Sequence, residues 1–171
     1  AKIPVISYDR LIKNADIDLY ITFDNVNVGE QQAKFVAEHL KDGKAKIVRI
    51  YGAKTDNNAS MFKEGQDKIL KPLIDSGAVT VLHEDWAEDW KPENAKRIVN
   101  AAITKSGASK NYDADFVLAS NDGTAAGAIQ ALSEEGLAGK ILVTGQDAEL
   151  VALQRIARGT QAMTIYKPIK N

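Results

Sequence analysis

The sequence predicts an α/β domain, a doubly wound parallel sheet with helices on both faces. The first observation is a regular alternation of short apolar runs with segments whose apolar residues recur at helical spacing. The second is that the runs are almost continuously apolar, which is typical of parallel strands buried on both sides. The third is a set of helix start and stop signals between the runs.

Apolar runs rich in Val, Ile, Thr and Tyr are predicted to be the strands. In chain order they are residues 3–8, 19–23, 45–52, 79–83, 115–120, 140–145 and 162–166. The predicted helices between them each carry one apolar face. These faces are Phe35, Val36 and Leu40; Phe62, Ile69, Leu70 and Leu73; Ala95, Ile98, Val99, Ala102 and Ile103; and Ala125, Ile129 and Leu132.

Local signals mark where the helices begin and end. Pro92 followed by Glu93 suits a first turn, where proline loses no hydrogen bond and an acid meets the positive end of the helix dipole. Asn121 or Asp122 is expected to cap one helix, and Asn57 or Asn58 another. Glycines suit the carboxyl-terminal ends of helices. They are Gly77, Gly107, Gly136 and Gly159.

Length and composition limit the function classes. A chain of 171 residues is long enough for one domain with a substantial core. The net charge is -1 and the basic residues are spread along the chain, so neither a nucleic-acid partner nor an anionic membrane is indicated. Cysteine is absent, which excludes disulfides and thiolate chemistry. No apolar run approaches membrane-spanning length, and we expect no membrane insertion.

Polar side chains follow almost every predicted strand, and ligands of open parallel sheets bind beyond the carboxyl ends of the strands. These residues are Asp9 and Arg10; Asp56, Asn57 and Asn58; Trp86 and Trp90; Asn121 and Asp122; Gln146 and Asp147; and Lys167. Carboxylates, amides and cations together suit sugar hydroxyls, which both donate and accept. Trp90 is expected to form a wall for the C–H face of a sugar ring, whereas Trp86 is expected to pack as part of the core or a lid.

Other interpretations are weaker. A single Asp or Asn after a strand is more often a turn former, and only its recurrence at successive strands favours binding. Phosphate-binding glycine motifs are missing, and His39 and His83 are expected to be structural. Asp9 and Asp147 could form a glycosidase pair, but no Glu stands at these strand ends in an acid role. We therefore expect no enzyme, no metal and no cofactor, with a phospho-receiver at Asp9 as a further alternative.

Several motifs resemble the class I periplasmic sugar-binding proteins, the relatives of ribose-binding protein. They include DNNASMFKEGQ, DWKPENA, VLASNDGTAAGAIQAL and VTGQDAEL, and the resemblance runs over essentially the whole chain. It implies a lobe of a two-lobed protein that closes on a monosaccharide, with D-xylose expected, and delivers it to an ABC transporter permease or a membrane sensor. It also implies the sugar-binding residues. They are Asp9, Arg10, Asn57 or Asn58, Trp90, Asn121, Asp147 and Lys167.

Family members are longer, so we expect this chain to be a piece that carries the second lobe. Residues 1–22 would be the last strand of the first lobe and a hinge crossover, 23–165 the sugar-binding lobe, and 166–171 a crossover stub. Sugar binding should then be weak or undetectable. The strand within residues 1–10 should pair on this domain's own sheet, pair with another chain or swap, giving a homodimer.

The resemblance implies an extracytoplasmic location for the intact protein, with its leader outside this chain. Two alternatives share the architecture. One is the effector-binding lobe of a sugar-responsive transcription regulator, and the other is a lobe that docks with a membrane sensor. An upstream helix-turn-helix would favour the regulator, and an upstream leader peptide would favour transport.

Overall fold

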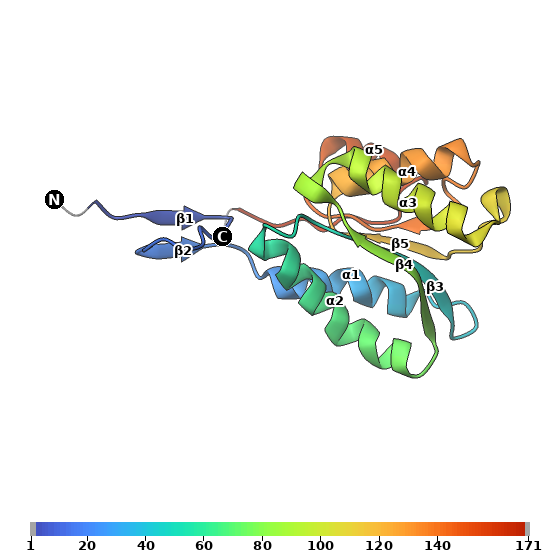
Figure 1. Ribbon diagram of the computed structural model, residues 1–171, viewed down its shortest axis with the longest axis horizontal. Coiled ribbons are helices and arrows are strands. Elements are labelled where there is room, and N and C mark those ends of the chain that lie inside the picture. Colours follow the sequence, from blue (N-terminus) through green and yellow to red (C-terminus); the bar gives the residue numbers. More distant parts are fainter. Residues whose placement is uncertain (1–2, 170–171) are drawn as a thin grey trace.

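The structure is a computed structural model that describes residues 3–169 (Figure 1). Its elements are β1 (Ile6–Tyr8), β2 (Leu19–Ile21), α1 (Asn25–Glu38), β3 (Ala45–Tyr51), α2 (Asn57–Asp75), β4 (Val79–Trp86), η1 (Glu88–Trp90), α3 (Pro92–Ser106), η2 (Ser109–Asn111), β5 (Phe116–Ala119), α4 (Asp122–Glu134), β6 (Leu142–Val143) and α5 (Leu150–Ala157). None of the helices between residues 3 and 169 has the length and apolar character needed to cross a membrane.

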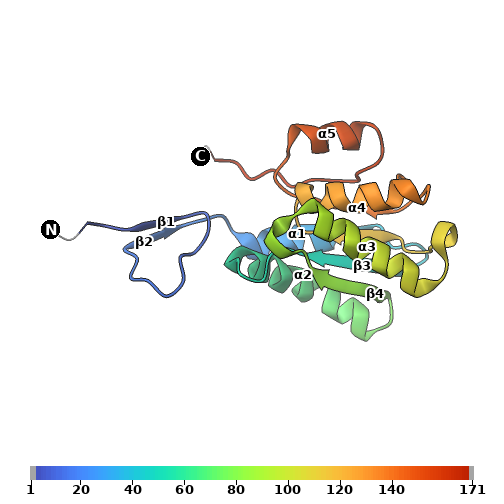
Figure 2. The ribbon, with the colours of Figure 1, turned by 45° about the horizontal axis from the view of Figure 1, so that its top comes forward.

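The central sheet has the strand order β4-β3-β5-β6, and every pairing in it is parallel. Helices α1 and α2 cover one face, whereas α3 and α4 lie on the other (Figure 1). Helix α5 lies outside α4 (Figure 2). The predicted doubly wound α/β fold is therefore confirmed.

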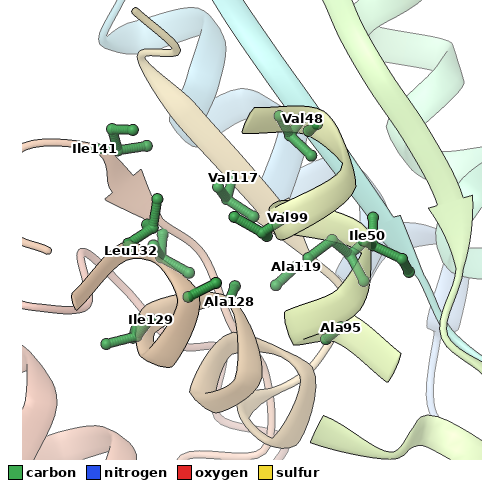
Figure 3. Close-up of a cluster of buried hydrophobic side chains, with 14 of the residues drawn as sticks. Val48, Ile50, Ala95, Val99, Val117, Ala119, Ala128, Ile129, Leu132 and Ile141 are labelled. Carbon is green, nitrogen blue, oxygen red and sulfur yellow. The ribbon is translucent and has the colours of Figure 1, made fainter. Parts of the chain in front are cut away.

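The two faces of β5 show why its run is continuously apolar. Phe116 and Leu118 belong to the core beneath α1 and α2. Val117 and Ala119 point the other way, into the core beneath α3 and α4 (Figure 3). Successive strand residues face opposite sides of a sheet, and here both sides are buried, so every position must be apolar.

Most of the predicted helix ends agree with the structure. Asn121 caps α4, in a capping box with Thr124, and Pro92 is the first residue of α3. Four glycines at helix ends have left-handed backbone conformations that favour glycine. They are Gly77, Gly107, Gly136 and Gly159, with φ of 76°, 67°, 70° and 77°.

The expected cap of α2 is wrong by one residue. Neither Asn57 nor Asn58 caps the helix, because Asp56 does so by accepting from the backbone N–H of Asn58. An ionised carboxylate is a stronger acceptor than a neutral amide and also interacts favourably with the helix dipole.

Two strand predictions also need correction. Residues 162–166 form no strand, although Ala162 N donates to Val143 O and Asp147 N donates to Ile165 O. Because β6 ends at Val143 and Asp147 and Ala148 have positive φ, the neighbouring backbone offers no regular ladder. Conversely, β4 runs beyond residue 83, and Trp86 is its last residue instead of following it.

Strands β1 and β2 pair in parallel and project from the domain as a separate two-stranded sheet (Figure 1). The first predicted strand thus pairs within the chain, but not on the central sheet. Ile6, Tyr8 and Leu19 of this arm are exposed. Two strands without a covering layer are marginal in water, so the arm depends on its attachment to the domain.

Helices α1 and α2 touch backbone to backbone. A Cβ at Gly65 would lie 1.9 Å from the carbonyl oxygen of Val26, and one at Gly29 would lie 2.0 Å from that of Phe62.

We expect Gly65→Ala to lower the free energy of unfolding by about 1–3 kcal/mol, because the helices must separate. Gly123→Ala is the control, since its Cβ would make only ordinary contacts. Equal denaturation midpoints for the two variants would contradict this packing.

Candidate functional site

One cavity lies where the strands of the central sheet and the arm end. Its volume is about 110 Å³. The lining residues follow β1, β3, β4, β5 and β6 or stand near the C-terminus of the described chain. They are Asp9, Arg10, Asp56, Asn58, Phe62, Trp90, Asn121, Gln146, Asp147 and Lys167.

All the predicted site residues except Asn57 line this cavity. Asn57 does not, and its amide instead lies 3.3 Å from the sulfur of Met61 on the same helix. The predicted set of sugar-binding residues lacks Asp56, Phe62 and Gln146. Asp56 and Gln146 stand among the residues that follow predicted strands, and Phe62 stands four residues after Asn58, on the same face of α2.

The carboxylate of Asp56 connects three parts of the cavity. One oxygen accepts the backbone N–H of Asn58 at 2.9 Å and so caps α2. The other accepts the indole N–H of Trp90 at 3.0 Å and lies 3.1 Å from Nε of Arg10. The Asp56 side chain is 5% exposed and that of Arg10 is 65% exposed. Asp56 therefore orients an aromatic wall and a cation from a buried position.

The position of Trp90 depends on the local backbone conformation and on Gly52, which faces its ring and has no side chain. Asp89 and Trp90 both have positive φ, 55° and 60°, which turns the chain sharply after β4. A Cβ on Gly52 would lie 2.1 Å from the Trp90 ring, so only glycine leaves room for the indole. Phe62 contacts the ring edge-on, with centroids 6.2 Å apart. The indole is thus fixed before any ligand arrives.

Asn58 ties the arm to the domain. Its Nδ2 donates to the backbone oxygen of Asp9 at 3.1 Å. Its Oδ1 accepts from the hydroxyl of Tyr20 at 3.2 Å and from Nδ2 of Asn25 at 3.1 Å. Asp9 itself has a φ of 63°, a conformation that Asp tolerates better than most residues. These bonds place Asp9 and Arg10 at the rim of the cavity.

Two amides in the cavity have unused hydrogen-bonding capacity among the described residues. Oδ1 of Asn121 accepts from Thr124, but its Nδ2 donates to no group within residues 3–169. Gln146 is 2% exposed, and its Oε1 is buried without a partner in the same range. Buried polar atoms in native proteins are usually paired, so the unpaired acceptor of Gln146 at a cavity is notable.

Asp147 and Lys167 form the remaining side. The Nζ of Lys167 lies 3.4 Å from Oδ1 of Asp147 and 5.0 Å from the centroid of the Phe23 ring. Burial raises the pKa of the Asp147 carboxyl above its usual value, and the Lys167 ammonium only partly opposes this. The nearby carboxylates of Asp122 and Glu149 act in the same direction as burial.

Asp122 lies behind the Asp147–Lys167 side of the cavity and binds the segments that carry these two residues. It is fully buried and accepts from the backbone N–H of Glu149 at 3.0 Å, from Gln161 at 2.8 Å and from Thr164 at 2.9 Å. These bonds join the loop after β6 to the extended segment that leads to Lys167. Asp122 therefore supports the cavity and does not line it.

Trp86 lies outside this cavity. Its ring packs on that of Tyr51, with centroids 4.9 Å apart, in agreement with the expected packing role. Within residues 3–169 no group of three or more His, Asp or Glu residues could hold a metal ion. The cavity combines an aromatic ring with carboxylates, amides and cations, a set suited to a neutral ligand rich in hydroxyls.

Comparison with known proteins gives consistent matches. Residues 1–171 match the model of a periplasmic binding protein domain. The D-xylose-binding periplasmic proteins of Escherichia coli and Haemophilus influenzae are each 50% identical to this chain over 167 residues, which is 98% of the chain and 49% and 48% of those proteins. The chain spans about half the length of the curated relatives it matches.

The fold is matched by solved structures as well. An ABC transporter solute-binding protein from Clostridium phytofermentans, with bound β-D-glucose, superposes with a TM-score of 0.84. It is 33% identical, and the match covers 96% of this chain and 54% of that one.

Gly52→Ala should displace the Trp90 ring, because the new Cβ would overlap it. In a Trp86→Phe background Trp90 is the only tryptophan, so its fluorescence reports the displacement directly. We expect its emission to shift to longer wavelength as the indole leaves Asp56 for water. The same background with Gly123→Ala serves as the control. Unchanged emission in the Gly52 variant would show that Gly52 does not make room for the ring.

The Asp147 carboxyl should titrate above the ordinary range for Asp, and Lys167→Met should raise its pKa further by removing the attracting charge. The folded chain binds this proton more tightly than the unfolded chain. This group's contribution to stability is therefore present below the ordinary Asp pKa and lost as the pH rises through the raised value. NMR titration of the side-chain carboxyl measures the shift, with Lys110→Met as the control. A lower pKa in Lys167→Met would contradict the assignment.

Proposed function

This chain belongs to the periplasmic binding protein domain family, and on that premise we propose that it forms one side of a binding site for a monosaccharide, D-xylose. The observation that carries the proposal is that one cavity gathers Trp90 with carboxylate, amide and cationic groups. The proposal is further supported by relatives named for D-xylose binding at 50% identity.

In the proposed complex the C–H face of the sugar ring packs on Trp90, whose indole Asp56 already orients. Preorganisation of this wall reduces the entropy lost on binding. The hydroxyls would be bound by Asp9, Arg10, Asn58, Asn121, Asp147 and Lys167. No bond of the sugar is broken in this role, so it is one of binding and not of catalysis.

The Asp147–Lys167 pair suits this role because each hydroxyl both donates and accepts. A hydroxyl placed between them donates to the carboxylate and accepts from the ammonium. The buried acceptor Oε1 of Gln146, and Nδ2 of Asn121, which donates to no described residue, would find partners either in the sugar or in a water molecule that the sugar orders. Binding would then give these groups hydrogen-bond partners.

We also propose the division of the chain into residues 23–165, which bear the cavity, and the flanking residues 1–22 and 166–171, which lead to a first lobe. The cavity contacts a sugar from one side, so water competes for each hydrogen bond and binding by this chain is weak. The intact protein would deliver its sugar to an ABC import system from an extracytoplasmic location.

The test is a titration of the ¹⁵N-labelled chain with D-xylose, followed by backbone amide signals. We expect saturable shifts at Asn58, Asn121 and Asp147. Because the site is one-sided, the dissociation constant should be roughly 1 mM or weaker, which corresponds to a binding free energy of about 4 kcal/mol or less. Trp90→Ala should remove them, and Arg158→Gln, an exposed change on the far end of α5, should not. Shifts that persist in Trp90→Ala, or their absence at much higher sugar concentrations, would contradict the proposal.

A further inference from the structure

A second cavity lies beside the first, and none of the predicted site residues lines it. Its volume is about 280 Å³, larger than that of the cavity at Trp90. The residues that characterise it are Lys54, Asp85, Trp86, Glu88, Asp89 and Arg97. We call it the Trp86 cavity. It is built from the connections that follow β3 and β4, together with the first turns of α3.

Trp86 forms the aromatic wall of this cavity. Its ring rests on Tyr51, which is 2% exposed, at a centroid distance of 4.9 Å and an angle of 44°. Trp86 itself is only partly buried. The Nζ of Lys54 lies 6.0 Å from the ring centroid. The indole is therefore supported from behind while part of it remains open to the cavity.

The charged groups around Trp86 are mostly unpaired. Within residues 3–169, Lys54, Asp85, Glu88 and Arg97 take part in no ion pair. One oxygen of Asp85 accepts the backbone N–H of Trp86, and the second makes no contact of this kind in the described chain. Among the described residues, Asp89 is the one charged group of this cavity that forms an ion pair, with Lys91 at 3.3 Å. Cationic donors and carboxylate acceptors thus surround the Trp86 ring, which packs on Tyr51.

This lining discriminates among ligand classes. An anion such as phosphate would face Asp85, Glu88 and Asp89, which outnumber the two cations. A cationic ligand would compete with Lys54 for the Trp86 ring. A purely apolar ligand would leave the charged groups desolvated without partners. A neutral ring that carries hydroxyls can accept from Lys54 and Arg97, donate to the carboxylates and place its C–H face on the indole.

We propose that the Trp86 cavity is an accessory carbohydrate site that binds a second pyranose ring beside the Trp90 cavity. Neighbouring residues of two chain segments line the two cavities. Ala53, Lys54 and Thr55 line one while the next residue, Asp56, lines the other. Likewise Glu88 and Asp89 line the Trp86 cavity, and the next residue, Trp90, lines the first. The proposal stands on the Trp86 lining and does not require that the Trp90 cavity bind sugar.

The two tryptophans make the sites separately observable, because the chain has only these two indole N–H groups. In ¹⁵N-labelled protein the Trp90 signal reports the first cavity and the Trp86 signal the second, and Trp86→Phe assigns them. The probe is D-xylose. Xylitol is the matched control, since it carries hydroxyls on an open chain and offers no ring face for stacking.

We expect D-xylose to shift the Trp86 indole signal saturably and xylitol to leave it in place. Arg97→Gln should weaken the Trp86 response by about 2- to 10-fold, the loss of one hydrogen bond, while the matched exposed change Arg158→Gln leaves it unaltered. Arg10→Ala, an exposed change at the other cavity, should leave the Trp86 response intact. Because Arg97 and Arg10 are exposed, these variants keep the fold.

Three results would overturn the proposal. They are a Trp86 signal that does not move in D-xylose, a shift of equal size in xylitol, and a Trp86 response that disappears in Arg10→Ala, which would show that it is relayed from the Trp90 cavity. The Trp90 signal tests the proposed function separately. A static Trp90 signal with a moving Trp86 signal would contradict that function and leave the accessory site standing.

Discussion

The arrangement of the candidate site depends on the buried carboxylate of Asp56. It caps α2, which is worth about 1 kcal/mol, and accepts from the Trp90 indole in a charge-assisted bond worth about 1.5–3 kcal/mol. The ion pair with the exposed Arg10 contributes at most about 1 kcal/mol. Asp56 therefore fixes the helix and the aromatic wall firmly and holds Arg10 most weakly. One side chain therefore holds α2 and Trp90 in fixed positions and leaves Arg10 the most easily moved of its partners.

The fold and the edge of the sheet that carries the site could be predicted from the sequence, because both follow from periodicity and from strand topology. The β5 run is apolar at every position since both of its faces are buried, and such a run is typical of a parallel strand between two helical layers. Residues 162–166 are also mostly apolar but form no strand. Their neighbour β6 stops at Val143, and nothing in the composition of 162–166 records the length of another strand.

Which of Asn57 and Asn58 faces the cavity could not be predicted from the sequence. Helical side chains are about 100° apart per residue, so a cap misplaced by one position turns a different residue toward the cavity. Asn58 and Phe62 are four residues apart, so they share a face of α2, and both line the cavity, whereas Asn57 does not. Gln146 follows a predicted strand, but the burial of its side chain could not be predicted, because it arises from the packing of the β5 and β6 connections. Trp86 ends a strand that is lengthened across an irregular register, a feature that composition does not reveal.

The amide of Asn58 has a mechanical consequence. It holds the Asp9 backbone and the Tyr20 hydroxyl at once, so it grips both strands of the projecting arm close to where the arm leaves the domain. A change in the angle of the arm would break these bonds or move Asp9 and Arg10 relative to Trp90, because both residues line the cavity that Trp90 lines. The orientation of the arm and the shape of the cavity are therefore linked through one amide.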